Sequence, residues 1–368
     1  MYLHIPFCLK KCNYCDFCSF PSPTKEEVAS YLEALKREIL EYKEESLIPI
    51  DTLYIGGGTP SLLSVFEFES IVKSIREVFL ILPECEFTVE ANPKTLTPEK
   101  VRAYRELGVN RISIGLQSIH KNEQKILGRV HDYDDFLASY NLCVEGGIKN
   151  INVDVMYAIP AQTLSSFEKT LDAVLSLRPN HISAYSLIVE DGTPFGNQRE
   201  SLGLPNESEE LEMYALLIEK LRGAGYSHYE ISAYAKDGFL SRHNLRYWHA
   251  EEYIGIGLSA YSYYRGVRFG NTKRLDEYLS EDYTKYRTCE RLCADDLAFE
   301  YAMLHLRLSD GISLSEYESR FGKSFASGKE ELIHRLVDEG LVRYEGDRLS
   351  LTERGFYVSN ELMAILID

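Results

Sequence analysis

The sequence predicts an α/β fold: an incomplete, TIM-like barrel of six βα units, followed by a smaller C-terminal helical, winged-helix-like domain. Short runs rich in β-branched and aromatic residues recur through the first half of the chain, with helical patterns between them. Near the C-terminus, residues 340–351 have the pattern of a tight hairpin between helices. Parallel strands require right-handed crossovers, so six units predict a curved, partly open barrel rather than a closed one of eight strands.

Six segments are expected to form the parallel strands: Tyr2–Ile5, Asp51–Ile55, Phe87–Glu90, Arg111–Gly115, Ile151–Met156 and His181–Ser186. The helices between them carry start signals. Thr24 and Glu27 make a capping box, and the threonine–proline pair at 97–98 begins another helix. Gly108 and Gly146 follow two of the helices and are expected to be C-terminal caps.

The regular alternation fades after about residue 205. We expect the barrel in residues 1–205 and a barrel extension with the substrate or haem region in residues 206–294. The extension should contain a helix near Ser208–Leu221 and a strand at Tyr229–Ser232. The winged-helix-like domain is expected in residues 295–368, where 15 acidic and 8 basic side chains oppose a nucleic-acid footprint.

The charge balance excludes several partner classes. With 57 acidic and 40 basic side chains in 368 residues, the formal net charge is −17, which opposes binding to nucleic acid and to anionic membrane surfaces. No apolar run is long enough to span a bilayer, and no signal peptide precedes the first motif. We therefore expect a soluble, cytoplasmic protein, with peripheral membrane contact left open.

Three cysteines lie close together as Cys8-x3-Cys12-x2-Cys15. A [4Fe–4S] cluster held by three cysteines keeps one iron without a protein ligand, free to bind a small molecule through amino and carboxylate groups. A zinc site closed by Cys18 is the alternative, but it lacks the usual second pair of ligands. A disulfide is disfavoured further, because nothing indicates an oxidising compartment.

The remaining cysteines are expected to be ordinary buried thiols. Cys85 and Cys143 have apolar surroundings, and Cys289 with Cys293 has the spacing of one turn of helix.

Polar residues and glycines stand at or near the ends of the predicted strands. Residues 56–60 read Gly-Gly-Gly-Thr-Pro, and these glycines allow backbone groups to approach a ligand closely. The segment lacks the lysine of a phosphate loop. Glu90, Gln117 and Asp154 each place a polar side chain in an otherwise apolar strand. Singly, each of them could be a satisfied buried group; recurring in successive strands, they are expected to face one pocket.

These motifs, together with Val-Glu-Ala-Asn-Pro and Ser-Ile-Gly-Leu-Gln-Ser, resemble the radical S-adenosylmethionine (SAM) enzymes, specifically the HemN/HemW branch of oxygen-independent coproporphyrinogen III dehydrogenases and haem chaperones. The resemblance spans nearly the whole chain. It implies that Cys8, Cys12 and Cys15 ligate the cluster. It implies SAM contacts from Tyr2, Tyr14, Gly57, Gly58, Thr59, Glu90, Gln117, Arg129 and Asp154, with further contacts from Ile188 and Tyr261.

The resemblance also implies the chemistry. An electron passing from the cluster into SAM would give methionine and a 5′-deoxyadenosyl radical. Glu90 and Asp154 would accept hydrogen bonds from amino and ribose hydroxyl groups, and Arg129 would pair with the SAM carboxylate. An electron donor such as flavodoxin or ferredoxin is expected.

Departures from the dehydrogenase pattern favour the haem-chaperone side of the branch. Seven residues precede Cys8, and Phe17 stands two positions after Cys15. Residues 229–234 and the His-Asn-x-x-Tyr-Trp stretch at 243–248 resemble the chaperones. We therefore expect a protein that binds haem or another tetrapyrrole and delivers haem to respiratory proteins, with SAM bound. The alternatives are a coproporphyrinogen III dehydrogenase of porphyrin biosynthesis and a radical methylase.

His243 is the candidate haem-iron ligand, with Arg242 and Arg246 close enough in sequence to meet propionates. The alternative is that His243 is a structural residue, hydrogen-bonded in the fold. Other candidate iron ligands are His228, His249 and Met303.

Overall fold

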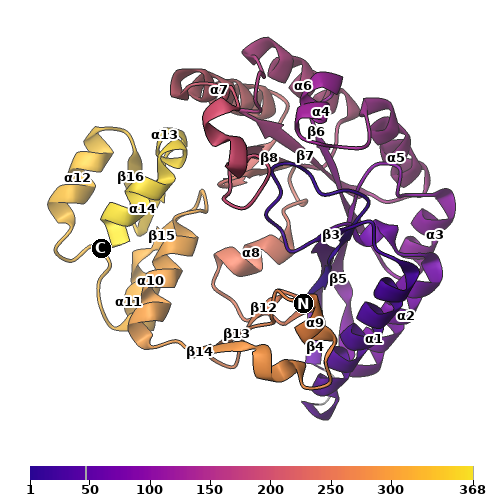
Figure 1. The fold of residues 1–368 in the computed structure, drawn as a ribbon. Coiled ribbons are helices and arrows are strands. Elements are labelled where there is room, and N and C mark those ends of the chain that lie inside the picture. The colour runs from indigo at the N-terminus through magenta and orange to yellow at the C-terminus, as the bar shows by residue number, and fades with distance from the viewer. Residues whose placement is uncertain (46–47, 368) are drawn as a thin grey trace.

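The computed structural model describes residues 1–45 and 48–367, and its centre is an open sheet of nine strands. Six neighbouring strands are parallel and alternate with helices along the chain (Figure 1). They are β1 (Tyr2–Ile5), β4 (Ile48–Gly57), β5 (Phe79–Ala91), β6 (Arg111–Gln117), β7 (Asn150–Tyr157) and β8 (His181–Ser186). Each contains one of the six predicted segments, so the predicted incomplete barrel is confirmed.

Three further strands extend both edges of this sheet. β11 (Gly255–Ile256) runs parallel to β1, while β10 (Ala233–Ala235) and β9 (Ser227–Glu230) add an antiparallel edge beside β8. The strand expected at Tyr229–Ser232 therefore exists but begins two residues earlier. Because β11 and β10 are only two and three residues long, periodicity did not reveal them.

Helices cover the outside of the barrel (Figure 1). They are α1 (Lys25–Glu41), α2 (Val65–Val78), α3 (Pro98–Glu106), α4 (Lys121–Ile126), α5 (Tyr133–Glu145) and α6 (Leu164–Leu177). The Glu27 amide donates to Thr24 Oγ1 at 3.1 Å and the capping box is complete, as predicted. Gly108 has a φ of +97° at the end of α3. Gly146 is the C-cap of α5, as predicted; its φ is −70°, and the left-handed residue is the next one, Gly147, at +81°.

Helix α8 (Arg242–Trp248) packs against β4, inside the curve of the sheet. The backbone amides of Arg242 and His243 donate to the Glu86 carboxylate at 3.1 and 3.0 Å. A carboxylate at the first turn of a helix accepts from amides that have no partner within the helix. This contact fixes α8 to β5.

The chain between barrel and C-terminus forms α7 (Glu207–Gly223), α9 (Leu275–Leu279) and a three-stranded sheet of β12 (Tyr261–Tyr264), β13 (Val267–Gly270) and β14 (Thr288–Arg291). Helix α7 contains the helix expected at Ser208–Leu221. The prediction for Cys289 and Cys293 was wrong: Cys289 lies on β14, Cys293 caps the next helix, and both are exposed. Cys85 and Cys143 are buried, as predicted.

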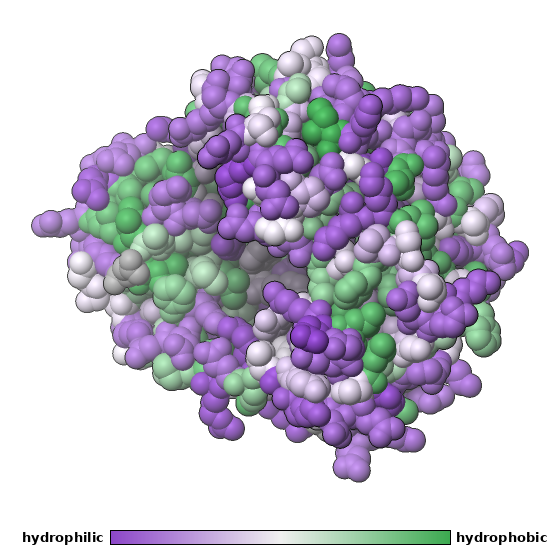
Figure 2. Space-filling model, in the orientation of Figure 1, coloured by the Kyte–Doolittle hydropathy of each residue, from purple (hydrophilic) through white to green (hydrophobic). Residues whose placement is uncertain are grey.

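The C-terminal part packs beside the barrel at the left of Figure 1. It contains α10 (Ala294–His305), β15 (Ile312–Ser313), α11 (Leu314–Phe321), α12 (Glu330–Asp338), β16 (Val342–Glu345), β17 (Arg348–Leu351), α13 (Glu353–Tyr357) and α14 (Ser359–Ile367). The antiparallel pairing of β16 with β17 confirms the predicted hairpin. In the same orientation the space-filling surface is hollowed near its middle, between this part and the barrel (Figure 2).

Candidate metal centre and cofactor pocket

The cysteine loop follows β1 and is closed by a short pair of parallel strands, β2 (Phe7–Cys8) and β3 (Phe20–Pro21). The Asn13 side chain donates to the carbonyl of Ile126 at 2.8 Å, and the Asn13 amide donates to the carbonyl of Leu127 at 2.9 Å. These bonds hold the tip of the loop against the end of α4, so the loop is anchored at its base and at its tip.

Cys8, Cys12 and Cys15 are free thiols, partly exposed, and line one pocket of about 150 Å³. Burial raises the pKa of Cys8 and raises that of Cys15 to about 11, so without a metal both thiols are protonated at neutral pH. Among the described residues, no three His, Cys, Asp or Glu side chains converge as a site for one metal ion. A [4Fe–4S] cluster places each thiolate on a different iron.

The glycine segment after β4 lies directly against the cysteine loop. The Gly58 amide donates to the carbonyl of Ile5 at 2.8 Å, and a Cβ added at Gly58 would lie 3.0 Å from Cys8 Sγ. Gly57 has a φ of +114°, and a Cβ there would lie 2.6 Å from the His4 ring. Only glycine allows the backbone to come this close to the thiols.

Glu90 lies at the carboxyl end of β5 and faces the same pocket. Its carboxylate accepts from the Tyr54 hydroxyl at 2.7 Å and from the Gly57 amide at 2.9 Å. Burial above all, with a smaller contribution from the charge of Asp154, nevertheless raises the pKa of the Glu90 carboxyl to about 7. Desolvation therefore outweighs the two hydrogen bonds, so a cationic or hydrogen-bond-donating ligand would favour the ionised form.

Asp154 stands on β7 and lines this pocket too. Its carboxylate accepts from the Asn152 side chain at 2.7 Å, and burial raises its pKa. Two carboxylates with raised pKa values in one pocket are a common mark of a ligand site.

Gln117 ends β6 with a φ of +70°, which is strained for a residue with a side chain. It is 8% exposed, and its Oε1 has no hydrogen-bond partner. Because a buried acceptor without a donor is costly, this atom fits a donor group on a ligand. The thiol set, the glycine segment and this orphan oxygen together fit a cluster with an amino- and hydroxyl-bearing molecule on its open iron.

Arg129 also lines the pocket, but its guanidinium is largely engaged. It donates to Gly115 O at 2.6 Å, Asn92 Oδ1 at 3.0 Å and Tyr14 Oη at 3.3 Å, and Nε lies 2.8 Å from His131 Nε2. Arg129 therefore fixes the pocket wall. Because these contacts use most of its five N–H donors, few remain to pair with a carboxylate.

Ten of the predicted site residues line this one pocket: Cys8, Cys12, Cys15, Tyr14, Gly57, Gly58, Glu90, Gln117, Arg129 and Asp154. Thr59 lies just outside it, with its hydroxyl 3.5 Å from Cys8 Sγ. Tyr2 and Tyr261 line an adjoining cavity. Ile188 lines neither of these two pockets and is 67% exposed.

His243 is placed in the core, with 1% of its surface exposed. Its Nδ1 lies 3.0 Å from Thr52 Oγ1 and its Nε2 lies 2.9 Å from the Tyr247 hydroxyl. Both ring nitrogens are thus engaged within the protein, which supports the structural alternative for His243 over iron ligation. Arg246 pairs with Asp51 and with Glu251 rather than facing a ligand.

The other candidate iron ligands lie in three different environments. His228 stacks on Tyr234 with ring centroids 4.3 Å apart, and burial lowers its pKa to about 4. His249 is exposed. Met303 lines a separate pocket of about 310 Å³ beside the C-terminal helices.

The adjoining cavity has a volume of about 570 Å³ and shares Lys11, Phe17, Ser19, Gly57 and Glu90 with the cluster pocket. Sequence reasoning missed most of its wall: Lys11, Asp16, Phe17, Cys18, Phe20, Tyr247, Tyr253, Ser259 and Lys273. The abundance of tyrosine between 253 and 264 was the one signal that could have suggested it.

In the part of the chain that the structure describes, no helix combines the length and apolar character needed to cross a bilayer.

Comparisons with known proteins agree with this geometry. The family model described as the Radical SAM superfamily matches residues 2–174, and that of the HemN C-terminal domain matches residues 292–358. The chain is 36% identical to the heme chaperone HemW of Lactococcus lactis subsp. lactis (strain IL1403), over 98% of this chain and 95% of that protein. It is 35% identical to the heme chaperone HemW of Bacillus subtilis (strain 168), over 100% and 98%.

Among solved structures, the coproporphyrinogen III oxidase HemN from Escherichia coli, described as a radical SAM enzyme, matches with a TM-score of 0.88. The alignment has 25% identity and covers 100% of this chain and 89% of that chain.

Proposed function

This chain belongs to the HemW family within the radical SAM superfamily, and from that premise we propose that it is a haem chaperone that carries a [4Fe–4S] cluster and SAM and delivers haem to respiratory proteins. The observation that carries the proposal is end-to-end similarity to curated haem chaperones at 35–36% identity. The cavity of about 570 Å³ beside the cluster pocket adds support, because it is in the usual size range of ligand sites.

The cluster is assigned to Cys8, Cys12 and Cys15, and when bound it supplies one-electron chemistry to SAM. Glu90 and Asp154 would accept hydrogen bonds from SAM amino and ribose hydroxyl groups, and the unpaired Gln117 Oε1 would accept another. Tyr14, Gly57, Gly58, Thr59 and Arg129 would shape this site. Tyr2 and Tyr261, on the adjoining cavity, are its outer members, and Ile188 would join them only if the exposed segment after β8 closed inward.

Further features of the proposal rest on the sequence pattern and the resemblance: reduction by a flavodoxin- or ferredoxin-like donor, a cytoplasmic location and the division into residues 1–205, 206–294 and 295–368. They leave the assignment of the site unchanged.

A coproporphyrinogen III dehydrogenase is the second candidate, favoured by the TM-score of 0.88 to HemN. The chain is 25% identical to HemN but 36% identical to a HemW protein, and for this reason the chaperone is preferred.

The test uses anaerobically reconstituted full-length protein. Wild type should bind ferric haem in a Soret titration and pass it to the haem-free form of a b-type respiratory cytochrome, without converting coproporphyrinogen III. Conversion of coproporphyrinogen III with release of 5′-deoxyadenosine and no haem transfer would replace the chaperone by the dehydrogenase. The Cys8→Ser, Cys12→Ser, Cys15→Ser triple variant shows whether transfer depends on the cluster, and Cys289→Ser is its matched control on an exposed strand.

A further inference from the structure

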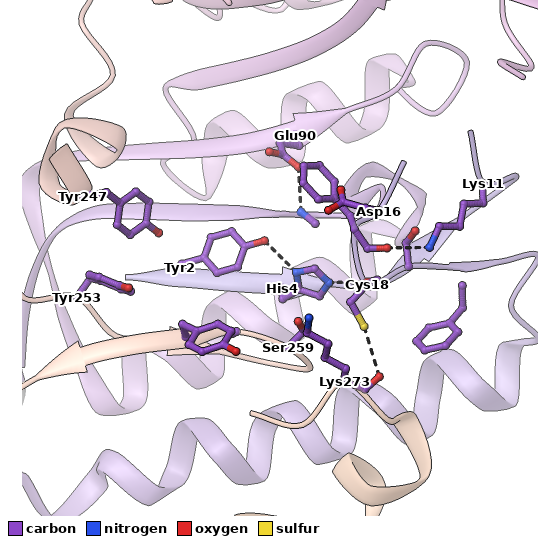
Figure 3. Close-up of a pocket in the computed structure, with 16 residues that line it drawn as sticks. Tyr2, His4, Lys11, Asp16, Cys18, Glu90, Tyr247, Tyr253, Ser259 and Lys273 are labelled. Atoms are coloured by element: carbon purple, nitrogen blue, oxygen red, sulfur yellow. Dashed lines mark hydrogen bonds between the residues drawn. The ribbon is translucent and has the colours of Figure 1, made fainter. Parts of the chain in front are cut away.

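The cavity of about 570 Å³ has two chemically different ends (Figure 3). Tyr2, Tyr247 and Tyr253 gather at one end, Lys11 lies at the other, and Lys273 lies between them beside Cys18 and Ser259. A flat ligand with an apolar body and anionic groups on one edge matches this division.

Contacts among the side chains hold the rings of the aromatic end in place. Tyr247 and Tyr253 meet edge to face with ring centroids 4.7 Å apart, and the Tyr247 hydroxyl lies 2.9 Å from His243 Nε2. The Tyr2 hydroxyl lies 2.9 Å from His4 Nδ1. Rings fixed in this way bind a planar partner with little further loss of side-chain freedom.

The opposite end is locally cationic in a protein of net charge −17. Lys11 donates to the carbonyl of Phe17 at 2.9 Å, and Lys273 is exposed. In the described part of the chain neither lysine forms an ion pair, and the acidic residues that line the cavity are Asp16 and Glu90. Two lysines without carboxylate partners suit a ligand that bears two carboxylates.

Cys18 is the one sulfur donor that lines the cavity. Its Sγ lies 3.5 Å from the carbonyl of Lys273 and also bonds the Ser259 side chain, and burial raises the pKa of the thiol. His4 offers no free ring nitrogen, because Nε2 lies 2.8 Å from the Cys18 carbonyl and Nδ1 bonds Tyr2. A cysteine thiolate is a known axial ligand of haem iron.

Ser19, next to Cys18, lies on the wall between the two pockets. It is 6% exposed and lines both the cavity and the cluster pocket. Its Oγ has no partner at ordinary hydrogen-bond geometry and faces the Cys8 thiol, whose pKa burial raises and this hydroxyl lowers in part. A ligand in the cavity or at the cluster can supply a better-aligned partner for this hydroxyl.

We propose that this cavity is the haem site: the macrocycle lies against Tyr247 and Tyr253, Cys18 ligates the iron, and Lys11 and Lys273 pair with the propionates. The proposal rests on the proposed function and deepens it by naming the site. It separates the cargo from SAM, which would occupy the smaller pocket on the other side of Gly57 and Glu90.

The experiment titrates ferric haem into anaerobically reconstituted protein and follows the Soret band. Cys18→Ser is compared with Cys289→Ser, a free cysteine on exposed β14. Lys11→Gln/Lys273→Gln is compared with Lys25→Gln/Lys169→Gln, which changes the net charge equally with two exposed lysines outside the cavity. Iron and sulfide content is measured for each variant, so that loss of the cluster is not mistaken for loss of the haem site.

We expect Cys18→Ser to move the Soret maximum and weaken binding, with Cys289→Ser unchanged. The Lys11/Lys273 variant should raise the haem Kd roughly fivefold and flatten its salt dependence, because two partly exposed ion pairs are lost. Wild-type spectra and affinity in both cavity variants, with haem still bound, would overturn the site while leaving the chaperone proposal intact. Failure of wild type to bind haem would instead refute the proposed function.

Discussion

His243 and Tyr247 are joined across one turn of α8 by a contact of 2.9 Å between imidazole Nε2 and the phenol oxygen. Residues four apart on a helix lie on the same face, so the pair can form without distortion. The other imidazole nitrogen bonds Thr52 on β4. The histidine of the His-Asn-x-x-Tyr-Trp stretch thus orients a tyrosine that lines the cavity, and we expect it to act through that tyrosine.

Replacing His243 should therefore affect stability more than the haem spectrum. His243→Ala leaves the Thr52 and Tyr247 hydroxyls unpaired and empties a buried site, so the free energy of unfolding should fall by roughly 2–4 kcal/mol. Tyr247→Phe removes one hydrogen bond and should cost about 1–2 kcal/mol. Denaturant unfolding measures both, and the Soret maximum should stay in place. A displaced Soret band in His243→Ala with unchanged stability would restore His243 as the iron ligand.

Glu90→Gln should stabilise the ligand-free protein in a pH-dependent way. The Glu90 pKa of about 7 lies above its ordinary 4.5, so the folded state binds a proton more tightly than the unfolded state. Glu90 therefore destabilises the fold above about pH 7, and this penalty fades as the pH falls toward 4.5. The variant should gain about 2 kcal/mol over wild type near pH 8 and little near pH 5, by denaturant unfolding. Equal gains at both pH values would contradict the raised pKa.

The same variant should bind SAM less tightly. Loss of a charge-assisted hydrogen bond weakens affinity about tenfold or more, measured by equilibrium dialysis on reconstituted protein. Cluster content should match wild type, because the carboxylate does not ligate iron. Unchanged SAM affinity would remove Glu90 from the proposed contacts.

Gly57→Ala tests the close approach between the glycine segment and β1. Alanine at this position would keep the strained φ of +114°, and its Cβ would lie 2.6 Å from the His4 ring. Hydrogen bonds to Tyr2 and to the Cys18 carbonyl hold that ring in place. We expect a loss of unfolding free energy above about 2 kcal/mol, together with lower cluster content. Gly192→Ala is the control, since its φ is +80° but a Cβ there meets nothing within 4 Å. Equal losses of unfolding free energy in both variants would show that backbone strain, and not the contact with His4, causes the effect.

Serine at Cys8, Cys12 or Cys15 should abolish the cluster in each case, because a thiolate is lost from one iron. Iron and acid-labile sulfide assays on reconstituted protein measure this. Cys18→Ser should keep near-wild-type iron and sulfide. If the wild-type protein instead contained zinc, without iron and sulfide, and all four variants lost that zinc equally, the four-cysteine zinc alternative would be supported.

Much of the fold was predictable because it is encoded locally. The six parallel strands and the capping box at Thr24 depend on residues adjacent in sequence, and the structure contains them. The C-cap of α5 at Gly146 was predictable in the same way, because the glycine directly follows the helical pattern. Cys289 and Cys293 were misplaced because a spacing of four residues also fits a strand residue followed by a helix cap.

The sequence by itself determined the cofactor machinery: three thiols at fixed spacing, glycines after a strand, and polar residues at strand ends. Such groups lie at one edge of a parallel sheet whatever the rest of the chain does. Only the tertiary structure showed that both ring nitrogens of His243 are hydrogen-bonded in the core and which residues line the large cavity. There Lys11 and Cys18 meet Tyr247, Tyr253 and Lys273, more than 200 residues away along the chain. Burial and hydrogen bonding across such separations depend on how the elements pack, which no local pattern specifies.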